Sequence, residues 1–396
     1  MVMPVSLRPR SSLKQERFAM DIKSEFPILN QLDFFNHAGV APISHRAAIA
    51  LQDYSLEASS YAYTKESWYP RISQVRQSIS KLIHARGEQE IAFVPNTSTG
   101  ISLVANGLTW HEGDNVVITN VEYPANRYPW ENLKRSGVEL IEVEQLPDGT
   151  IDAEDVCEAI TNRTRVVSLS SVQYASGFRM DLKPIADLVH QAGGYLCVDG
   201  IQSVGLIPMD VQKLGVDFLA ADGHKWLLGP EGLGFFYINE DLVHRLNPAV
   251  LGWHSVVNPM DFGNYNFELH MDAKRFEPGT HNIPGIVAMG ASIDLLLDVG
   301  IDTVWQNVQK LNNQLCDGLP NAGCRIISPR GKGQTSGSVV FEPISESVNP
   351  KRVVVELAKE KIIAVVREGR IRVSPHFYNQ PQQIDRLLKQ LDKLCK

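Results

Sequence analysis

Short apolar runs alternate with amphipathic stretches along the chain up to about residue 240. Each run could form one buried strand, and the stretch from residue 67 to 85 carries Ile72, Val75, Ile79 and Leu82 at helical spacing. Strands that alternate with helices predict an α/β fold with a mostly parallel, doubly wound sheet. The predicted strands are residues 91–94, 115–119, 139–143, 166–172, 195–199, 218–221 and 234–238, the last of which would close the sheet.

The pattern loosens after Leu242, and a second unit follows an apolar stretch that is predicted as a helix over 286–299. We therefore expect a large domain over residues 26–285 and a smaller α+β C-terminal domain over 286–396, with residues 26–40 placed to pack on the small domain. Residues 1–25 are expected to be extended or disordered, because their basic first part lacks the apolar core of a secretory signal. The strands predicted in the small domain are 336–341, 362–366 and 371–373.

Composition excludes several classes of protein. The chain has 396 residues, a hydrophobic fraction of 43% and a net charge of -7, which are the values of an ordinary globular protein without a basic face for nucleic acid or anionic membranes. No apolar run approaches the ~18 residues that a membrane span needs. The five cysteines are scattered, and no CxxC or His-rich cluster suggests a metal site. These features predict a reduced, cytoplasmic protein without a metal.

Asp199 and Lys225 each follow one of two neighbouring predicted strands. The crossover between those strands predicts that they are parallel, so both residues lie at the sheet edge where open α/β folds bind ligands. A partly desolvated lysine can form an imine with an aldehyde, and a carboxylate can hold the proton on a pyridine nitrogen. Alone, each would fit an ordinary loop lysine or a capping aspartate. Together they favour pyridoxal phosphate.

A hydroxyl-rich motif, NTSTG over residues 96–100, separates a predicted strand from a helical stretch. The hydroxyls of Thr97 and Ser98 could cap the helix, and with the helix dipole they could equally hold a phosphate group. Because the chain has no Walker A motif and no GxGxxG after a strand, neither ATP nor NAD is the expected phosphate compound.

A set of motifs gives the chain a family resemblance from Leu32 to Leu391. The chain resembles class V aminotransferases, the pyridoxal-phosphate-dependent family that includes cysteine desulfurases, isopenicillin N epimerase and kynureninase. The resemblance implies the PLP-dependent transferase fold type I and a homodimer with shared active sites. The motifs that carry it are NTSTGISLVA, VEYPANRYPW, YLCVDGIQSVG, DGHKWLLGPEGLGFFY, RFEPGTHN and IRVSPHFYN.

The resemblance also implies roles for residues around the cofactor ring. Lys225 would form the imine with the cofactor and move the proton at the substrate α-carbon. Asp199 would pair with the pyridine nitrogen, Gln202 would bind the phenolic oxygen, and Tyr123 would stack on the ring where desulfurases have a histidine. Tyr174 stands where desulfurases have an asparagine, a departure that points toward the epimerase-like branch.

Further roles concern the phosphate and the substrate. Thr97, Ser98 and His224 would hold the phosphate, together with Gly279 and Thr280 from the partner subunit. The substrate would be bound by two residues. Arg372 would pair with the α-carboxylate, a geometry that suits a guanidinium, and His37 is a second candidate. Desulfurases have a serine where this chain has Asp222, whose carboxylate is a poor phosphate ligand.

The leading interpretation is a class V aminotransferase, and two alternatives stay open. A C–S lyase or an amino-acid epimerase could use the same scaffold, because the same imine chemistry begins all of these reactions. Epimerisation would need a second acid such as Tyr123 or His37. A non-catalytic binding module is the third interpretation, which the presence of Lys225 and Asp199 disfavours. A desulfurase that carries a persulfide does not fit, because no cysteine lies between Arg325 and Leu394.

Overall fold

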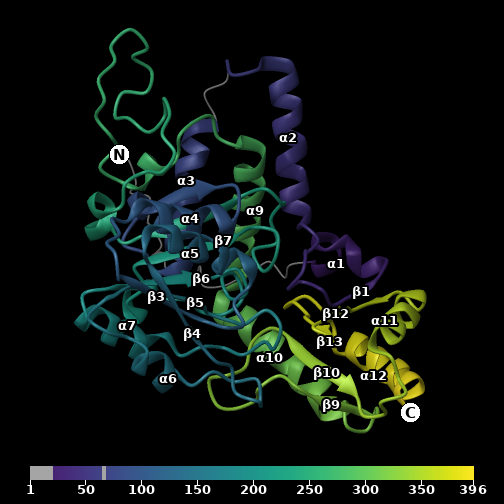
Figure 1. The fold of residues 1–396 in the computed structure, drawn as a ribbon. Helices are drawn as coiled ribbons and strands as arrows, with labels where there is room; N and C mark the ends of the chain where they lie inside the picture. Colours follow the sequence, from purple (N-terminus) through teal and green to yellow (C-terminus); the bar gives the residue numbers. More distant parts are fainter. Residues whose placement is uncertain (1–20, 65–67) are drawn as a thin grey trace, which may run out of the picture.

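The computed structural model describes residues 21–64 and 68–396, and a seven-stranded sheet forms its centre (Figure 1). The helices are α1 Ile22–Glu25, α2 His45–Tyr61, α3 Trp68–Ile83, α4 Thr97–Gly107, α5 Tyr128–Glu131, α6 Ala153–Glu158, α7 Leu182–Gln191, α8 Val211–Leu214, α9 Ile283–Val299, α10 Ile301–Gly318, α11 Pro350–Lys359 and α12 Pro381–Cys395. The strands are β1 Asp33–Phe34, β2 Ile91–Val94, β3 Asn115–Thr119, β4 Glu139–Val143, β5 Thr164–Ser170, β6 Tyr195–Asp199, β7 Phe218–Asp222, β8 Gly234–Ile238, β9 Cys324–Ile326, β10 Val339–Pro343, β11 Ile362–Ile363, β12 Val365–Arg367 and β13 Arg370–Val373.

The central sheet has the strand order β2-β8-β7-β6-β5-β3-β4. Strands β3 to β7 are parallel to their neighbours among themselves, whereas β8 is antiparallel to both β7 and β2. The prediction of a mostly parallel α/β sheet is therefore confirmed. The prediction that β8 closes the sheet is wrong, because its two edges are both hydrogen-bonded and the earlier strand β2 forms the edge.

Helices cover both faces of this sheet, as a doubly wound fold requires. Alternate residues of β7 point to opposite faces, so Leu219 belongs to the core under α3, α7 and α9, and Ala220 to the core under α4 and α5. Helix α4 packs so closely on β7 that a Cβ added at Gly100 would lie 2.6 Å from the Ala220 Cβ. This close contact fixes the N-terminus of α4 beside the end of β7.

The C-terminal part of the chain forms a second sheet, antiparallel, with the order β12-β13-β10-β9. The N-terminal segment reaches it, because β1 pairs in parallel with β11 through Asp33 and Ile362. Ala364 separates β11 from β12, so the single strand predicted over 362–366 is two strands. Helix α9 packs against α2 and α3, and the domain bounds at 285 and 286 stay a prediction.

Part of the predicted N-terminal extension, residues 1–20, lies outside the described residues. Residues 22–25 form helix α1 rather than an extended segment, and the side chain of Asp21 caps it by accepting from the Lys23 amide. Within the described chain, none of the helices by itself combines the length and the apolar character that crossing a membrane requires.

A buried ion pair joins α3, β2 and the segment before α9. The Arg76 guanidinium donates two hydrogen bonds of 2.6 Å to the two carboxylate oxygens of Glu277, which also accepts from the Phe93 amide at 2.6 Å. Burial would raise the pKa of Glu277, but Arg76 and His281 overcome this and lower the pKa to about 2. The pair thus fixes the segment that carries Gly279 and Thr280 to the body of the large domain.

We expect Glu277→Gln to lower the free energy of unfolding by about 3–5 kcal/mol, because it leaves the Arg76 charge buried without its partner. Glu342→Gln is the matched control: its ion pair with the exposed Arg325 is worth about 0–1 kcal/mol. Urea unfolding measures both. Because the pKa of Glu277 is depressed in the folded state, its contribution is present above pH about 4.3 and is lost as the pH falls toward 2. Equal effects of the two substitutions would contradict this assignment.

Candidate active site

A cavity of about 400 Å³ lies where the carboxyl ends of β6 and β7 meet the N-terminus of α4 and the β12–β13 turn. Its lining combines residues that are far apart in the sequence, from the N-terminal segment to the small domain. Nine of the residues predicted for the site line it: Thr97, Ser98, Tyr123, Tyr174, Asp199, Gln202, His224, Lys225 and Arg372.

Parallel pairing of β6 with β7 explains why Asp199 and Lys225 meet. Asp199, the last residue of β6, lies opposite Ala220 in the register, and β7 ends two residues later at Asp222. The chain then turns sharply, with the Gly223 amide donating to the Leu233 carbonyl at 2.8 Å and Leu228 at a φ of 57°. The turn leaves the Lys225 side chain in the cavity instead of in solvent.

Burial changes the protonation of both groups. Burial lowers the pKa of Lys225 to about 8, although the Asp199 carboxylate acts in the opposite direction. Burial likewise raises the pKa of Asp199 to about 7. The Ile201 amide, which donates to the Asp199 carboxylate at 3.0 Å, and the charge of Lys225 both lower this pKa but do not outweigh burial. A substantial fraction of the Lys225 side chains is therefore neutral near pH 8, and a neutral amine is the form that attacks an aldehyde.

Two tyrosines form one wall of the cavity. Their rings are perpendicular, with 5.2 Å between the centroids of Tyr123 and Tyr174. The Lys225 Nζ atom lies 5.8 Å from the Tyr123 centroid, and Tyr123 remains half exposed. The Tyr174 hydroxyl donates to the Glu368 carboxylate at 3.1 Å, so this wall is tied to the small domain.

The opposite end of the cavity has the features of an anion site. Thr97 is the first residue of α4, and its buried Oγ1 has no hydrogen-bond partner among the described residues. Asn96 caps the helix by accepting from the Thr99 amide. His224 and Asp222 also lie here, with 3.2 Å between Nδ1 and Oδ1. The carboxylate of Asp222 accepts from its neighbouring Gly223 amide. Asp222 thus contacts the imidazole, and no hydroxyl donor stands at its position.

The small domain contributes two guanidinium groups. Arg372 is buried, and its Nη1 donates to the Tyr174 carbonyl at 2.9 Å. In the part of the chain that the structure describes, its Nε has no hydrogen-bond partner. Burial and the charge of Arg367 lower the pKa of Arg372 to about 9. Arg367, which sequence reasoning missed, also lines the cavity. The Glu368-Gly369 turn has positive φ angles of 46° and 77°, which are typical of a two-residue β-hairpin turn. This local signal could have predicted that Arg367 lies on the same hairpin as Arg372.

Three predicted residues are outside the cavity. His37 is fully buried, and its ring nitrogens contact the Ser374 carbonyl and the Tyr378 hydroxyl, so it is not available to a substrate in this cavity. Gly279 and Thr280 do not line the cavity of their own chain, and Thr280 is exposed. The roles assigned to Gly279 and Thr280 require a second copy and stay predictions.

One further cluster escaped sequence reasoning, which expected no metal site. The ligand atoms of His254, Glu277 and His281 lie within 4.8 Å of one another. The carboxylate of Glu277 is already held by Arg76, and burial lowers the pKa of His254 to about 4, with the charge of His281 as a second cause. The Arg76 charge opposes a cation at this position.

The residues present fit pyridoxal phosphate. Lys225 supplies an amine of lowered pKa, Asp199 a buried carboxylate beside it, and the orphaned Thr97 hydroxyl at a helix N-terminus a donor for a phosphate. Gln202 lines the same space, although its amide already accepts from Trp226 and donates to the Ala38 carbonyl. The fold and this set of groups define a PLP-dependent enzyme of fold type I.

Comparison with known proteins identifies the family. The model of class V aminotransferases matches residues 34–387, so the chain belongs to this family. A probable cysteine desulfurase of Halalkalibacterium halodurans is 31% identical over 95% of this chain and 97% of its own length, and one of Methanothermobacter thermautotrophicus is 29% identical over 95% and 98%. The uncharacterized aminotransferase YcbU of Bacillus subtilis is 30% identical over 91% and 93%.

Solved structures agree with this assignment. The apo structure of a cysteine desulfurase from Thermococcus onnurineus superposes with a TM-score of 0.87 at 25% identity, covering 95% of this chain and 97% of that one. The cystine C–S lyase C-DES, in complex with cysteine persulfide, gives 0.86 at 25% identity, with 94% and 100% covered. A C-DES mutant carries glycine covalently linked to its PLP cofactor.

We expect the rate at which the apoprotein attaches pyridoxal phosphate to rise about tenfold per pH unit and to level off near pH 8, because only neutral Lys225 reacts. Stopped-flow absorbance measures this rate. Asp199→Asn removes the carboxylate that raises the pKa of Lys225, so the midpoint should move to lower pH. Lys225→Ala is the control and should attach no cofactor. A midpoint near the ordinary lysine value of about 10.4 would disprove the desolvation argument.

Proposed function

We propose that this protein is a PLP-dependent C–S lyase, which removes a sulfur leaving group from the β-carbon of an amino acid without a thiol carrier. The observation that carries the proposal is the set of groups around the cavity. Its described lining has one lysine and two arginines but no cysteine. Cysteine desulfurases and a cystine C–S lyase are among the similar proteins.

The positions of the cysteines favour direct elimination over a persulfide route. Cys324 and Cys395 pack in the core of the small domain with β9, β10 and α12. The neighbouring Cys395 and burial raise the pKa of the Cys324 thiol, and burial raises the pKa of Cys197, inside β6, to about 12. Cys324 lowers the pKa of Cys395, but Cys395 is itself buried and does not line the cavity. A buried thiol with a raised pKa is a poor nucleophile. Sulfur therefore has to leave with the product itself.

The chain's own residues would divide the work. Pyridoxal phosphate, when bound, withdraws electrons from the α-carbon of an attached amino acid. Lys225 would take the α-proton and pass a proton to the departing sulfur, which suits an amine that titrates near pH 8. Arg372, buried with its Nε free, would bind the α-carboxylate. The Asp199 carboxylate would hold the proton on the ring nitrogen.

Arg367 narrows the substrate class. Arg372 would pair with the α-carboxylate of the substrate, which leaves the Arg367 guanidinium in the same cavity free to pair with another anionic group. This favours an amino acid that carries a second anionic group. L-cystine has two carboxylates and a β-carbon that carries sulfur. Its elimination with water gives pyruvate, ammonia and cysteine persulfide, and no oxidant or reductant is required.

Transamination is the second candidate, and the relative YcbU, described as an aminotransferase, supports it. This reaction would need Lys225 to return the proton to the cofactor instead of to sulfur. Epimerisation has less support, because His37 is engaged away from the cavity and Tyr123 is the remaining candidate for an acid on the second face. The cavity groups also disfavour a non-catalytic module.

The deciding experiment incubates the loaded enzyme with L-cystine, L-cysteine and a panel of other amino acids. We expect pyruvate and cysteine persulfide to form in equal amounts from cystine, because direct elimination releases both. Arg372→Ala should raise KM at least tenfold with little change in cofactor binding, since it removes a charge-assisted bond worth about 1.5–3 kcal/mol. Lys225→Ala should be inactive.

The alternative outcomes are distinct. Bleaching of the bound cofactor by an amino acid, with recovery on addition of a keto acid, would replace the lyase by an aminotransferase. Formation of the opposite enantiomer would indicate an epimerase. An unchanged KM in Arg372→Ala would remove this residue from the site.

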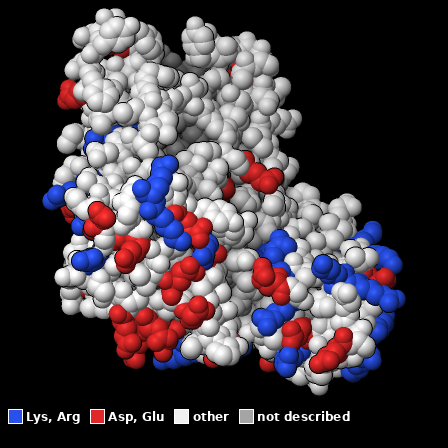
Figure 2. Space-filling view, viewed as in Figure 1, with Lys and Arg blue, Asp and Glu red and all other residues white. Residues whose placement is uncertain are grey.

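We also infer that two copies of the chain form a homodimer. The loop before α9 exposes a run of large apolar side chains, and the upper part of Figure 2, where this loop and α2 lie, has few charges. The exposed apolar side chains in this loop include Met260, Phe262, Tyr265, Phe267 and Met271. Contiguous exposed apolar surface marks an interaction site, and a second copy is the partner that would also bring Gly279 and Thr280 to a shared site.

We expect light scattering after gel filtration to give twice the chain mass of 44.1 kDa. Replacing Phe262 and Phe267 by glutamate should shift the protein toward the monomer, because each buries a charge in the contact. Ile344→Glu, at an equally exposed apolar position on the small domain, is the matched control and should remain dimeric. A wild-type monomer would refute the inference.

The cysteines support a cytoplasmic location. All five lie in the described part of the chain and are free thiols. Free thiols without a disulfide are typical of a reducing compartment.

A further inference from the structure

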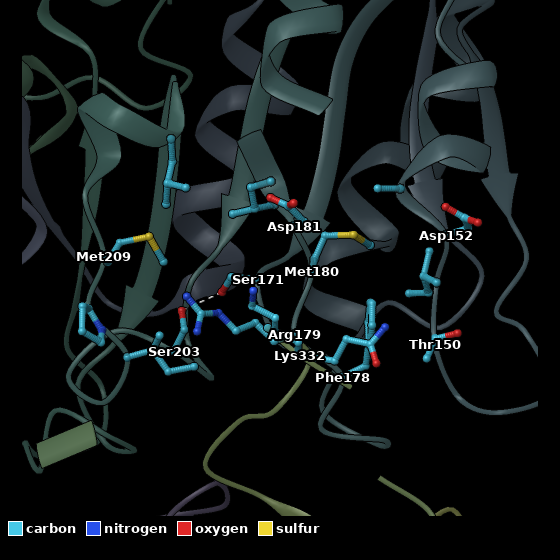
Figure 3. A pocket seen from close by; sticks show the side chains of 18 of the residues that line it. Thr150, Asp152, Ser171, Phe178, Arg179, Met180, Asp181, Ser203, Met209 and Lys332 are labelled. Carbon is cyan, nitrogen blue, oxygen red and sulfur yellow. Dashed lines mark hydrogen bonds between the residues drawn. The ribbon is translucent and has the colours of Figure 1, made fainter. Parts of the chain in front are cut away.

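The structure has a second cavity, of about 500 Å³ (Figure 3). None of its lining residues lines the catalytic cavity. The ends of β5 and β6 separate the two spaces: Asp199 and Gln202 face the catalytic cavity, whereas Ser171 and Ser203 face the second one. Its volume is in the range of small-molecule sites, about 300–1,000 Å³.

Apolar side chains and two hydroxyls form the walls and floor. Phe178, Met180 and Met209 are buried members of the main core that face this space. The Ser171 and Ser203 hydroxyls are 2.6 Å apart, and Ser171 donates to the Asp199 carbonyl at 3.1 Å. The floor is thus already hydrogen-bonded within the protein and leaves the apolar walls to contact a ligand.

Two cations without a carboxylate partner line the same space. Within residues 21–64 and 68–396, Arg179 has no ion pair, and its guanidinium lies over the Trp305 ring at 5.9 Å from the centroid. Lys332, from the loop between β9 and β10, is exposed and likewise has no ion pair in that part of the chain. A partly buried guanidinium without an acceptor is costly, and a bound anion would relieve that cost.

The carboxylates that face the cavity are engaged elsewhere. Asp181 is the acidic group that acts on Arg179, yet its oxygen caps α7 by accepting from the Lys183 amide. Asp152 caps α6 by accepting from the Glu154 amide, and Figure 3 shows it at the other end of the cavity from Ser203. Despite Asp181, burial lowers the pKa of Arg179, which indicates that its charge is poorly compensated.

We propose that the second cavity binds a small organic carboxylate, whose acid group pairs with Arg179 and Lys332 and whose apolar body fills the space against Phe178 and Met180. Planar bidentate pairing with a carboxylate is the geometry for which guanidinium is best suited. This site is separate from the catalytic one and does not depend on the reaction proposed above.

A short hairpin connects the two sites. Val172 pairs with Arg179 in an antiparallel bridge, and the Gln173 amide donates to the Phe178 carbonyl at 2.8 Å. The tip of this hairpin carries Tyr174, whose carbonyl accepts from Arg372. The Arg179 amide donates to the Gln334 carbonyl at 3.0 Å, so the stem is also joined to the small domain. A carboxylate on Arg179 would hold the base of the hairpin that positions Tyr174.

The test uses the full-length enzyme with pyridoxal phosphate bound, and it measures benzoate and its neutral analogue benzamide by titration calorimetry. We expect benzoate to bind and benzamide to bind at least tenfold more weakly. Arg179→Met keeps the length and the apolar stem of the side chain. It should lower the affinity for benzoate by about tenfold to hundredfold, which is the usual effect of losing a charge-assisted hydrogen bond. Arg135→Met, at an exposed arginine outside the cavity, is the matched control and should bind as the wild type does.

Arg372, in the catalytic cavity, provides the second control. Because Arg372 could also take benzoate, the titration is repeated with Arg372→Met, which should retain the binding that Arg179→Met loses. If Arg179→Met fails to fold, Lys332→Met, a substitution on an exposed loop, takes its place in the test. Lys332→Met should bind benzoate several-fold more weakly than the wild type does. The proposal is overturned by absence of benzoate binding, by equal affinity for benzamide, or by binding that disappears with Arg372 and survives without Arg179 and Lys332.

Discussion

The parallel alignment of β6 with β7 is the constraint on which the rest of the site depends. Parallel strands end at the same edge of the sheet, so Asp199 and the turn that carries Lys225 are brought together although 25 residues separate them. The close contact of α4 with β7 then adds the N-terminus of that helix to the same edge. The Lys225 amine, the Asp199 carboxylate and the N-terminus of α4 therefore meet without any contribution from the C-terminal sheet.

Desolvation at this edge has opposite effects on the two titrating groups. It makes the Lys225 amine easier to deprotonate and the Asp199 carboxylate easier to protonate, while the attraction between the two charges opposes both changes. A bound cofactor with a ring nitrogen would give the Asp199 carboxylate a positive partner in addition to Lys225. The residues are thus arranged for a charged ligand between them.

In the proposed function, the β12–β13 hairpin would determine which substrates the site accepts. Arg367 and Arg372 come from the β12–β13 hairpin, and the hairpin that carries Tyr174 contacts it through Arg372 and Glu368. The same Tyr174 hairpin carries Arg179 into the second cavity. Selectivity for the substrate and any influence of a ligand in the second cavity would therefore act through one small piece of structure at the domain boundary.

The sequence by itself determined the strands of the central sheet and most of the residues that line the candidate active-site cavity, because periodicity and strand ends depend on neighbours in the chain. Asp199, Lys225 and Thr97 could be placed from the strands or helices that they adjoin. The position of β8, the hydrogen bond between His37 and Tyr378, and the hydrogen bond from Arg372 to the Tyr174 carbonyl were decided only by tertiary structure. These features depend on contacts between segments distant in sequence, whose energies no local pattern contains.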